Sequence, residues 1–411
     1  MTDQKKLTIL GGSSIASPVM VQELVKRADR PAFEVCLVGR TRDKLEKVAG
    51  VCAALAEKAA APLTVSFETD LRAGVAGADY ILNQVRVGGL PARTYDETFP
   101  HKFGILGEET FGPGGMSNAL RTIPVVLDYC KVIEQVAPQA VMLNLTNPNS
   151  YIQYAAVTYS QVNVIGVCDS PVGIAEGIAA LLDVPYEELW VEYAGMHHFG
   201  WIVKACWRGV DMLPEIMRKI EQVGSLPVDA EIAKAMGGIP TSYFKYYYHA
   251  NRVFEKQQAQ PSNRAQQLME LEAQVLSDFE RDSSAIPASL EARGAHWYGA
   301  IVAPVLLAHV NNENKVFTLN VVNRGAVPWL PETAIIETPT LVGGHGFVPL
   351  QPAATPPDLQ AMVRLNATFE MLWAEAVVEH DREKALRALM LNHLVHNLDQ
   401  AKGILDELWK F

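Results

Sequence analysis

A cysteine and a pair of histidines near the middle of the chain are the residues best suited to chemistry. The cysteine lies in Gly166-Val-Cys-Asp-Ser-Pro-Val-Gly173, and the histidines lie in Gly195-Met-His-His-Phe-Gly-Trp201. A thiolate and an imidazole can share one metal ion. A glycine turn at residues 11–14, after the first apolar segment, can bind a nucleotide. The combination predicts a reaction that uses both a Lewis acid and a redox cofactor.

The other cysteines are expected to be structural. They do not have disulfide-like spacing, which fits a reducing compartment. Cys168 differs from them because turn-forming and polar residues follow it directly. The expected structural cysteines are Cys36, Cys52, Cys130 and Cys206.

The first part of the chain alternates apolar strand patterns with helical patterns. Such alternation predicts right-handed crossovers and a mostly parallel, doubly wound sheet of the Rossmann type. The expected strands are 6–10, 33–38, 64–67, 80–84, 140–144 and 162–167, and the first two expected helices are 18–27 and 43–61. Gly11, Arg86, Asn147 and Cys168 each follow an expected strand, so they are expected to converge on one crevice at the carboxyl edge of the sheet.

The remainder is less regular and predicts a mixed α+β domain for substrate and metal. We expect an α/β protein with a Rossmann-like domain over residues 1–170 and this second domain over 171–411, with the site between them. The helices expected here are 173–183, 214–222, 261–280, a long one over about 286–309 and a final pair after 356, and the expected strands are 316–322 and 334–338.

Composition limits the possible partners. The chain has 411 residues and a formal net charge of -11, with no basic stripe interleaved with aromatics, which argues against nucleic acid. No apolar run is long enough to span a membrane, and the first residues lead into a strand pattern rather than a signal peptide. We therefore expect a cytoplasmic protein without a membrane partner.

The turn Gly11-Gly12-Ser13-Ser14 departs from the usual dinucleotide fingerprint, because the third glycine is missing. Its backbone N–H groups and the helix start that follows it remain suited to a pyrophosphate. The second strand ends in Gly39-Arg40 rather than in an acid for a ribose hydroxyl. Arg40 is either a solvated residue ahead of a helix or a partner for a 2′-phosphate, which leaves NADP as an alternative to NAD.

Motifs in a fixed order along most of the chain resemble glycoside hydrolase family 4, the NAD- and metal-dependent glycosidases, which share their fold with lactate and malate dehydrogenases. No single motif is decisive, but their order and spacing together are specific. The matching segments are Ala78-Asp-Tyr80, Arg86-Val-Gly-Gly89, Arg93-Thr-Tyr-Asp-Glu97, Gly107-Glu-Glu-Thr-Phe-Gly-Pro-Gly-Gly115, Leu120-Arg-Thr-Ile-Pro124, Asn144-Leu-Thr-Asn-Pro148, Cys168-Asp-Ser-Pro171, His198-Phe-Gly-Trp201, Ile239-Pro-Thr-Ser-Tyr243, Arg264-Ala265 and Asn320-Val-Val-Asn-Arg-Gly325.

The resemblance implies that Cys168 and His198 are the protein ligands of a divalent metal, generally Mn²⁺. His197 is an alternative ligand, and it stands where the family usually has Asn. Tyr243 occupies the place of the catalytic base, and a nearby cation would have to lower its pKa from about 10. Asp169 matches the acid of members that act on 6-phospho-α-glucosides, although Ser170 replaces the Met of that subgroup.

The resemblance also assigns the sugar contacts. Arg264 is similar to the phosphate-binding arginine of the family, with Arg93 and Ser13 as helpers, and a guanidinium fork suits a dianion. Glu109 and Asn147 would hold sugar hydroxyls. The expected substrate is a 6-phosphorylated glycoside, with a 6-sulfonated or unphosphorylated sugar as the alternative. Relatives are commonly dimers or tetramers, so a homo-oligomer is expected.

In the implied reaction, NAD first oxidises C3 of the sugar to a ketone, and Tyr243 then removes the proton at C2. The glycosidic oxygen leaves with help from Asp169 as the acid. Water then adds, and the ketone is reduced again. A plain NAD(P)-dependent dehydrogenase is the main alternative; it would share the fold but need no metal. A catalytically inactive sensor is a third. It would be expected to lack Cys168, His198 or Tyr243, and all three are present.

Overall fold

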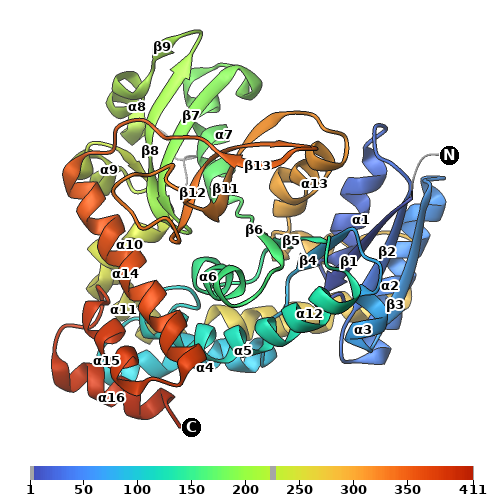
Figure 1. The fold of residues 1–411 in the computed structure, drawn as a ribbon, viewed down its shortest axis with the longest axis horizontal. Coiled ribbons are helices and arrows are strands. Elements are labelled where there is room, and N and C mark those ends of the chain that lie inside the picture. Colours follow the sequence, from blue (N-terminus) through green and yellow to red (C-terminus); the bar gives the residue numbers. More distant parts are fainter. Residues whose placement is uncertain (1–3, 223–227, 411) are drawn as a thin grey trace.

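A single large sheet runs through the molecule. The computed structural model describes residues 4–222 and 228–410. The first three residues, on which the expectation of no signal peptide partly depends, lie outside the described part. The strand order is β10-β8-β7-β12-β11-β6-β5-β4-β1-β2-β3, with β13 pairing β12 and β9 pairing β8. Figure 1 shows the parallel strands on the right and the β7–β8 hairpin at the upper left.

The parallel half of the sheet confirms the Rossmann-like expectation. Six strands pair in parallel in the order β3-β2-β1-β4-β5-β6. Their bounds, and those of the intervening helices, are β1 Lys5–Leu10, α1 Ser17–Lys26, β2 Phe33–Val38, α2 Arg42–Lys58, β3 Leu63–Glu68, α3 Leu71–Val75, β4 Tyr80–Asn83, α4 Gly89–Thr98, α5 Gly112–Val136, β5 Val141–Asn144, α6 Asn149–Tyr159 and β6 Asn163–Gly166.

Five of the six strands are mostly apolar on both faces because helices cover both faces, whereas the edge strand β3 alternates apolar with exposed polar residues. Along β1, Leu7 and Ile9 belong to the buried cluster that contains residues of α1 and α2, whereas Leu10 belongs to the cluster that contains residues of α5 and α6. This alternation within one strand follows from the two-residue repeat of its side chains.

Antiparallel strands extend the sheet beyond β6. β11 pairs with β6 at Asn320 and Gly166, and β12 then joins β11 to β7. The sheet therefore crosses residue 170, where we placed a domain boundary; that division remains a prediction. The strands of this half are β7 Leu189–Met196, β8 Phe199–Trp207, β9 Val210–Asp211, β10 Ile239–Pro240, β11 Lys315–Val322, β12 Ile335–Gly343 and β13 Gly346–Pro349.

Two helical expectations in this half were wrong. The segment expected as one helix over 286–309 is broken at Gly294, with a short 3-10 helix Ala288–Arg293 before it and a π-helical turn Tyr298–Val302 leading into α13 Ala303–Val310. The break occurs because Gly294 adopts a left-handed backbone with φ 64° that ends the first piece. The chain end forms three helices instead of a pair: α14 Pro357–Glu379, α15 Arg382–Leu391 and α16 Leu398–Leu408.

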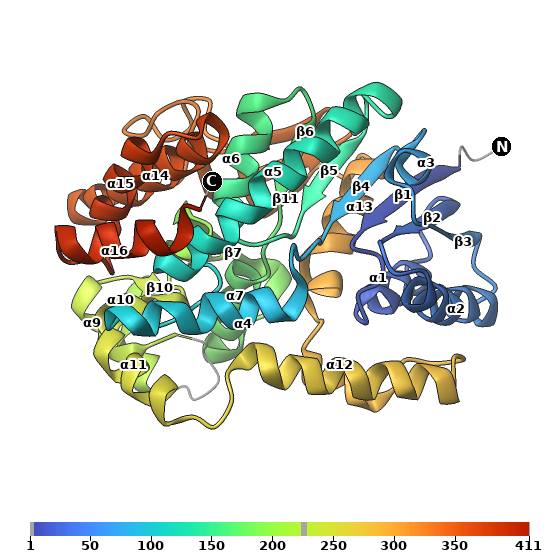
Figure 2. The same ribbon diagram turned by 90° about the horizontal axis from the view of Figure 1, so that it is seen from below.

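The remaining helices are α7 Ser170–Leu182, α8 Leu213–Lys219, α9 Ala230–Met236, α10 Lys245–Tyr248, α11 Ala250–Ala259 and α12 Arg264–Arg281. Figure 2 shows α12 running below α4 and reaching α2, where Lys44 Nζ and Glu272 Oε1 lie 2.6 Å apart. α12 thus connects the parallel half of the sheet with the second half of the molecule. Within the described residues, we find no helix long and apolar enough to cross a bilayer.

Candidate active site

A row of polar and glycine residues crosses the sheet at one level. These positions pair with one another strand by strand, so they lie side by side under the carboxyl edge of the parallel strands. Asn83 Nδ2 donates to Asn144 Oδ1 at 2.8 Å, and Asn320 Nδ2 donates to Glu337 Oε1 at 2.9 Å. The row consists of Asn83, Asn144, Gly166, Asn320, Glu337, Gly195 and Gly200.

Gly166 is required in this row for steric reasons. A Cβ there would lie 2.4 Å from Asn149 Oδ1 and 2.5 Å from Gln153 Oε1. The side chain of Asn149 in turn donates to Asn144 O at 2.9 Å. The loops that carry the candidate site residues are therefore held by buried amides directly beneath them.

The two histidines form the tip of the β7–β8 hairpin. Met196 pairs with Phe199, so His197 and His198 are the whole two-residue turn. His198 has a left-handed backbone with φ 61°, and Thr241 Oγ1 donates to its carbonyl at 2.8 Å. Two-residue hairpin turns commonly need a positive φ. The hairpin geometry thus explains why two imidazoles project together from one short turn.

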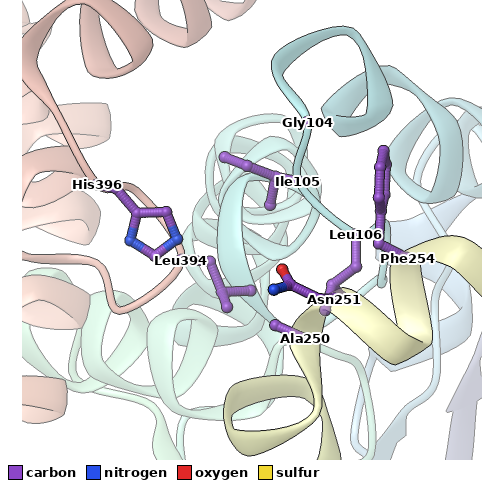
Figure 3. A pocket seen from close by; sticks show the side chains of 8 residues that line it. All are labelled: Gly104, Ile105, Leu106, Ala250, Asn251, Phe254, Leu394 and His396. Atoms are coloured by element: carbon purple, nitrogen blue, oxygen red, sulfur yellow. The ribbon is translucent and has the colours of Figure 1, made fainter.

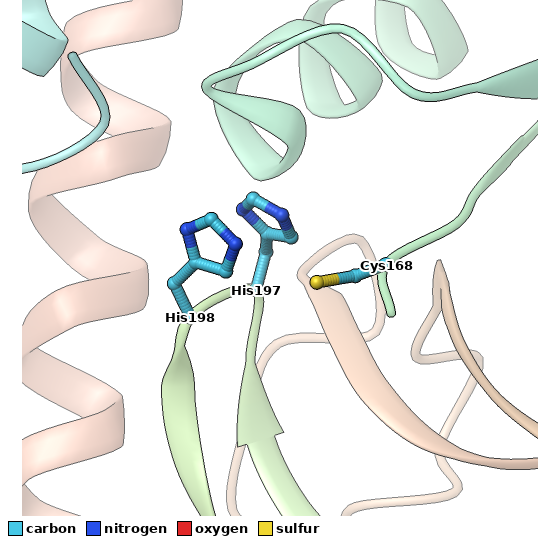
Figure 4. A group of neighbouring side chains, drawn as sticks. All are labelled: Cys168, His197 and His198. Carbon is cyan, nitrogen blue, oxygen red and sulfur yellow. The ribbon is translucent and has the colours of Figure 1, made fainter. Parts of the chain in front are cut away.

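The cysteine after β6 lies against these imidazoles. Cys168, His197 and His198 are all buried, and one possible ligand atom from each lies within 4.8 Å of the others. Figure 4 shows both rings at the hairpin tip and the thiol directed toward them. Nδ1 of His198 is buried without a hydrogen-bond partner among the described residues, and the Cys168 sulfur accepts only the Ser170 N–H, at 3.5 Å. A soft divalent metal ion fits this set of free donors.

Burial keeps these groups uncharged in the protein alone. It lowers the pKa of His197 to about 3 and lowers the pKa of His198 well below its usual value. Burial, together with Glu337 and Asp169, raises the pKa of the Cys168 thiol. Neutral imidazoles are ready to bind a metal, and a cation bound here would displace the thiol proton.

Tyr243 lies on the other side of His198. The two rings stack with centroids 3.7 Å apart and an angle of 12° between their planes. Burial, followed by the charges of Glu108 and Cys168, raises the pKa of Tyr243 well above 10. In the protein alone Tyr243 is therefore a phenol, and only a nearby cation would make its oxygen basic at neutral pH.

Asp169 follows Cys168 and precedes the first residue of α7. Its Oδ2 lies 2.7 Å from Nε2 of His296, which comes from the segment between the short 3-10 helix and the π-helical turn. The carboxyl is partly exposed, with 28% of its side-chain surface accessible, and the His296 side chain is 72% accessible. The acid candidate is thus open to solvent and is oriented by a histidine.

A group of arginines surrounds Glu109. Arg86 forms an ion pair with Glu109, and Arg93 Nη1 lies 2.8 Å from Glu109 Oε1. Burial alone would raise the pKa of Glu109, but these two guanidinium groups lower it to about 2. Burial and the charges of Arg86 and Arg93 lower the pKa of Arg293 to about 10. Arg293 lies over the Trp297 ring at 4.9 Å. The region therefore holds the Glu109 carboxylate among three arginines, with two further acids, Glu97 and Glu108, near Arg93.

Arg264 and Asn147 lie at the ends of helices beside this region. Arg264 is the first residue of α12 and is exposed, and its guanidinium makes no hydrogen bond or ion pair with the described residues. Its neighbour Ala265 donates its N–H to Glu97 Oε2 at 3.0 Å, while Arg93 Nε donates to the other oxygen of Glu97 at 2.7 Å. Asn147 precedes a cis proline, and its carbonyl accepts Nδ2 of Asn118 at 3.0 Å.

The glycine turn is built for close backbone approach. A Cβ on Gly12 would lie 2.7 Å from Leu37 Cα, and Gly11 has φ 79°. Both N–H groups donate to Val38 O, at 3.0 and 2.8 Å, so they are not free for a phosphate. The N–H groups of Ser14 and Ser17 are also taken, by Gly11 O and Ser14 O at 3.0 Å each, and Pro18 has none. The donors that remain include the N–H of Ser13 and the hydroxyl groups of Ser13 and Ser14. Arg40 is exposed after β2, where a nucleotide ribose would lie in this type of fold.

Three residues near the site escaped the sequence analysis. Arg293 and His296 fall within the segment expected to be a regular helix, which concealed the loop between them. Glu337 is fully buried, and burial raises its pKa to about 8. A lone acid in the apolar segment Ile335-Ile336-Glu337 was the available signal for it.

A small pocket lies away from this site. It is lined by Gly104, Ile105, Leu106, Ala250, Asn251, Phe254, Leu394 and His396, and Figure 3 shows their side chains. None of them is a candidate site residue, so the pocket provides no alternative location for the chemistry.

Two solved dehydrogenases resemble this chain in fold. Malate dehydrogenase from Plasmodium falciparum aligns with a TM-score of 0.59 at 11% identity, covering 91% of this chain and 99% of that one. Lactate dehydrogenase from Eimeria maxima aligns with a TM-score of 0.58 at 14% identity, covering 97% and 98%. These alignments show that the chain shares the fold of these two dehydrogenases.

Sequence profiles identify the family within that fold. The profile described as "Family 4 glycosyl hydrolase" matches residues 5–184, and that described as "Family 4 glycosyl hydrolase C-terminal domain" matches residues 193–395. The chain belongs to glycoside hydrolase family 4, and the expected family is confirmed.

Relatives cover nearly the whole chain. A "Probable 6-phospho-beta-glucosidase" of Bacillus subtilis is 31% identical over 99% of this chain and 96% of its own. A "6-phospho-alpha-glucosidase" of Leptotrichia buccalis is 25% identical, covering 98% and 96%.

A solved 6-phospho-beta glucosidase from Thermotoga maritima, with NAD and glucose-6-phosphate, aligns with a TM-score of 0.90 at 25% identity over 98% of this chain and 97% of its own. A solved 6-phospho-alpha-glucosidase from gut microorganisms, with NAD and Mn2+, gives 0.88 at 25% identity over 99% and 97%.

Proposed function

We propose that this enzyme hydrolyses 6-phosphoglycosides through transient oxidation of the sugar, with NAD and a divalent metal as cofactors. One observation carries the proposal: the buried Cys168 and His198, with their free donor atoms, lie against Tyr243. A plain dehydrogenase of this fold has no need for such a metal cluster. The NAD, Mn2+ and glucose-6-phosphate in the solved relatives support the same chemistry here.

The two cofactors, when bound, supply a hydride acceptor for C3 of the sugar and a Lewis acid for its C2 and C3 oxygens. Cys168 and His198 would hold the metal, and Ser13 and Ser14 would hold the dinucleotide phosphates. Gly12 allows the turn to pack closely on β2, and Gly11 allows it to pack on the segment after β4. Arg40 would lie at the ribose. The structure leaves NAD and NADP as alternatives at that position.

The protein's own residues would carry the proton transfers. Tyr243 would remove the C2 proton, because its hydroxyl belongs to the ring that stacks on His198. Asp169 would protonate the departing glycosidic oxygen, and its partial exposure gives it access to replacement protons. Water would then add at C1, and the returning hydride would restore the sugar.

The arginine-rich region would bind the sugar and its phosphate. Glu109, ionised at neutral pH, is suited to accept hydrogen bonds from sugar hydroxyls, with Asn147 beside it. Arg93 in α4 and the N–H of Ala265 in α12 both contact the Glu97 carboxylate, which brings the start of α12 close to Arg93. Arg264 precedes Ala265 and has no competing carboxylate partner in the described structure. These features favour a 6-phosphate as the recognised group.

We further propose the α-anomer as the preferred substrate, on the basis of Asp169 after the metal-binding cysteine. The relatives include enzymes named for both anomers, so the argument depends on this residue. The cytoplasmic location and the homo-oligomer also remain predictions.

The test is hydrolysis of the paired nitrophenyl 6-phospho-α- and 6-phospho-β-glucosides with NAD, Mn²⁺ and a reductant. We expect nitrophenol release from the α-substrate without steady accumulation of NADH. Faster release from the β-substrate would overturn the anomer assignment. Net NADH production would identify a dehydrogenase, and equal rates on the unphosphorylated glucosides would refute phosphate recognition.

A further inference from the structure

The histidine next to His198 has the same access to the metal site. His197 is 6% exposed and His198 is 5% exposed, and both belong to the turn whose ligand atoms group with the Cys168 sulfur. Their rings lie together, with centroids 3.6 Å apart and an angle of 27° between the planes. In Figure 4 the ring of His197 lies between that of His198 and the thiol.

His197 has no other evident use for its imidazole. Its ring forms no hydrogen bond or ion pair with the described residues, and the ring that it stacks on is that of His198. A buried imidazole without a polar partner loses its hydration and gains little in return. A metal ion that accepts its nitrogen lone pair would offset that loss.

We infer that His197 is a third protein ligand, so that Cys168, His197 and His198 together form a three-donor site for a borderline divalent metal such as Zn²⁺ or Co²⁺. One thiolate and two imidazoles are the donors that these ions prefer, and three protein ligands leave an open position for substrate oxygens. Mn²⁺ prefers carboxylate, carbonyl and water oxygens. Each imidazole that replaces an oxygen ligand therefore favours Zn²⁺ and Co²⁺ over Mn²⁺.

This inference rests on the proposed function for the role of the metal, but its test does not require turnover. The purified, metal-free full chain is titrated with Co²⁺, Zn²⁺ and Mn²⁺ separately, in competition with a chromophoric chelator. X-ray absorption of the Co²⁺-loaded protein counts its sulfur and imidazole donors.

The informative variant is His197→Asn, since Asn is well suited to a two-residue hairpin turn and lacks the ring nitrogen. His198→Asn removes the other imidazole. His309→Asn is the control, because it removes a partly buried imidazole that stacks on Phe347, outside the metal cluster. Circular dichroism of each variant checks that it is folded. If His197→Asn does not fold, His197→Gln replaces it in the measurements.

The expected result is one sulfur and two imidazoles around Co²⁺ in the unaltered protein, and one imidazole in each of the two site variants. His197→Asn should weaken Co²⁺ and Zn²⁺ binding at least about tenfold, with a smaller effect on Mn²⁺. His309→Asn should leave both results unchanged. A single imidazole in the unaltered protein, or an unchanged ratio of Zn²⁺ to Mn²⁺ affinity in His197→Asn, would overturn the inference. Absence of glycosidase activity would instead contradict the proposed function and leave these measurements intact.

Discussion

Cys168 shows how one residue's surroundings give it a chemical role. Five cysteines occur in the chain, and four are buried in the described structure, so burial alone does not distinguish it. Cys168 differs because two imidazoles lie within reach of its sulfur. The elevated thiol pKa means that the protein alone does not create a thiolate, and the metal must do so.

Replacing Cys168 with Ser should abolish hydrolysis and leave dinucleotide binding intact, because the nucleotide turn lies on a different strand. Turnover of the nitrophenyl substrate and quenching of protein fluorescence by NADH measure the two properties. Cys206→Ser, in β8, is the control and should retain activity. Normal turnover in Cys168→Ser would refute the metal assignment.

Tyr243→Phe should lower the rate by about 10²–10⁴-fold, the usual contribution of a general base. It should also stop exchange of the sugar C2 proton with deuterated water, which nuclear magnetic resonance detects. Tyr248→Phe is the control, because Tyr248 belongs to the same aromatic run but is 44% exposed. It should change neither the rate nor the C2 exchange. C2 exchange at the original rate in Tyr243→Phe would exclude Tyr243 as the base.

At the scale of elements, the β7–β8 hairpin decides where the imidazoles lie. Gly195 and Gly200 form the second pair below the turn, next to the pair of Met196 and Phe199. A Cβ on Gly195 would lie 2.4 Å from Gly200 Cα, and the residue has φ 152°. The two strands approach each other closely there only because neither position carries a side chain.

Gly195→Ala should therefore distort the hairpin tip, destabilise the protein and weaken metal binding. Gly209→Ala is the matched control, because Gly209 has φ 82° with no atom within 4 Å of an added Cβ. The control should lower the free energy of unfolding by about 1–2 kcal/mol, because alanine disfavours its left-handed backbone conformation. Gly195→Ala should lower the free energy of unfolding by roughly 1–3 kcal/mol more, because its Cβ overlaps the backbone of Gly200.

Urea denaturation and Co²⁺ titration measure these effects. Only Gly195→Ala should lose metal affinity. Equal stability and equal Co²⁺ affinity in the two variants would show that the close contact at Gly195 does not hold the site.

At the scale of the whole molecule, a continuous sheet joins both halves, and α14 near the chain end packs on α5 and α6. Glu370 in α14 is 7% exposed. Burial raises its pKa from the ordinary 4.5 to about 7, although Asn366 Nδ2 donates to its Oε1 at 2.8 Å. The folded protein therefore holds a proton on Glu370 that the unfolded chain releases near pH 4.5.

The sign of the pH dependence follows from that difference. Between about pH 4.5 and 7 the folded state binds more protons than the unfolded state, so the contribution of Glu370 to stability falls as the pH rises. Glu370→Gln removes this titration. The variant should gain up to roughly 3 kcal/mol relative to the unaltered protein between these limits, and the difference should be constant above them.

Urea denaturation at pH 5, 6, 7 and 8, with the denaturation midpoints of both proteins compared, measures that gain. A stability difference that does not change with pH would contradict the elevated pKa of Glu370.

The sequence predicted the parallel half of the sheet accurately because its strands are mostly apolar, apart from the alternating edge strand β3, and end at turn signals. It also named Cys168, His198 and Tyr243, since their motifs are local. Arg293 and His296 were missed because a helical pattern concealed the break at Gly294. Glu337 and the polar row were missed because they become neighbours only through strand pairing.

The sequence by itself determined the family, through the resemblance of its ordered motifs, and the Rossmann-like part of the fold. The order and spacing of local motifs are enough for both, and the roles of the site residues remain predictions. The tertiary structure decided which groups meet: that a two-residue turn brings both histidines to Cys168, that His296 reaches Asp169, and that arginines from separate elements surround Glu109. The physical reason is that these contacts join residues far apart in the chain, and pairing across the sheet, rather than any local pattern, sets their distances.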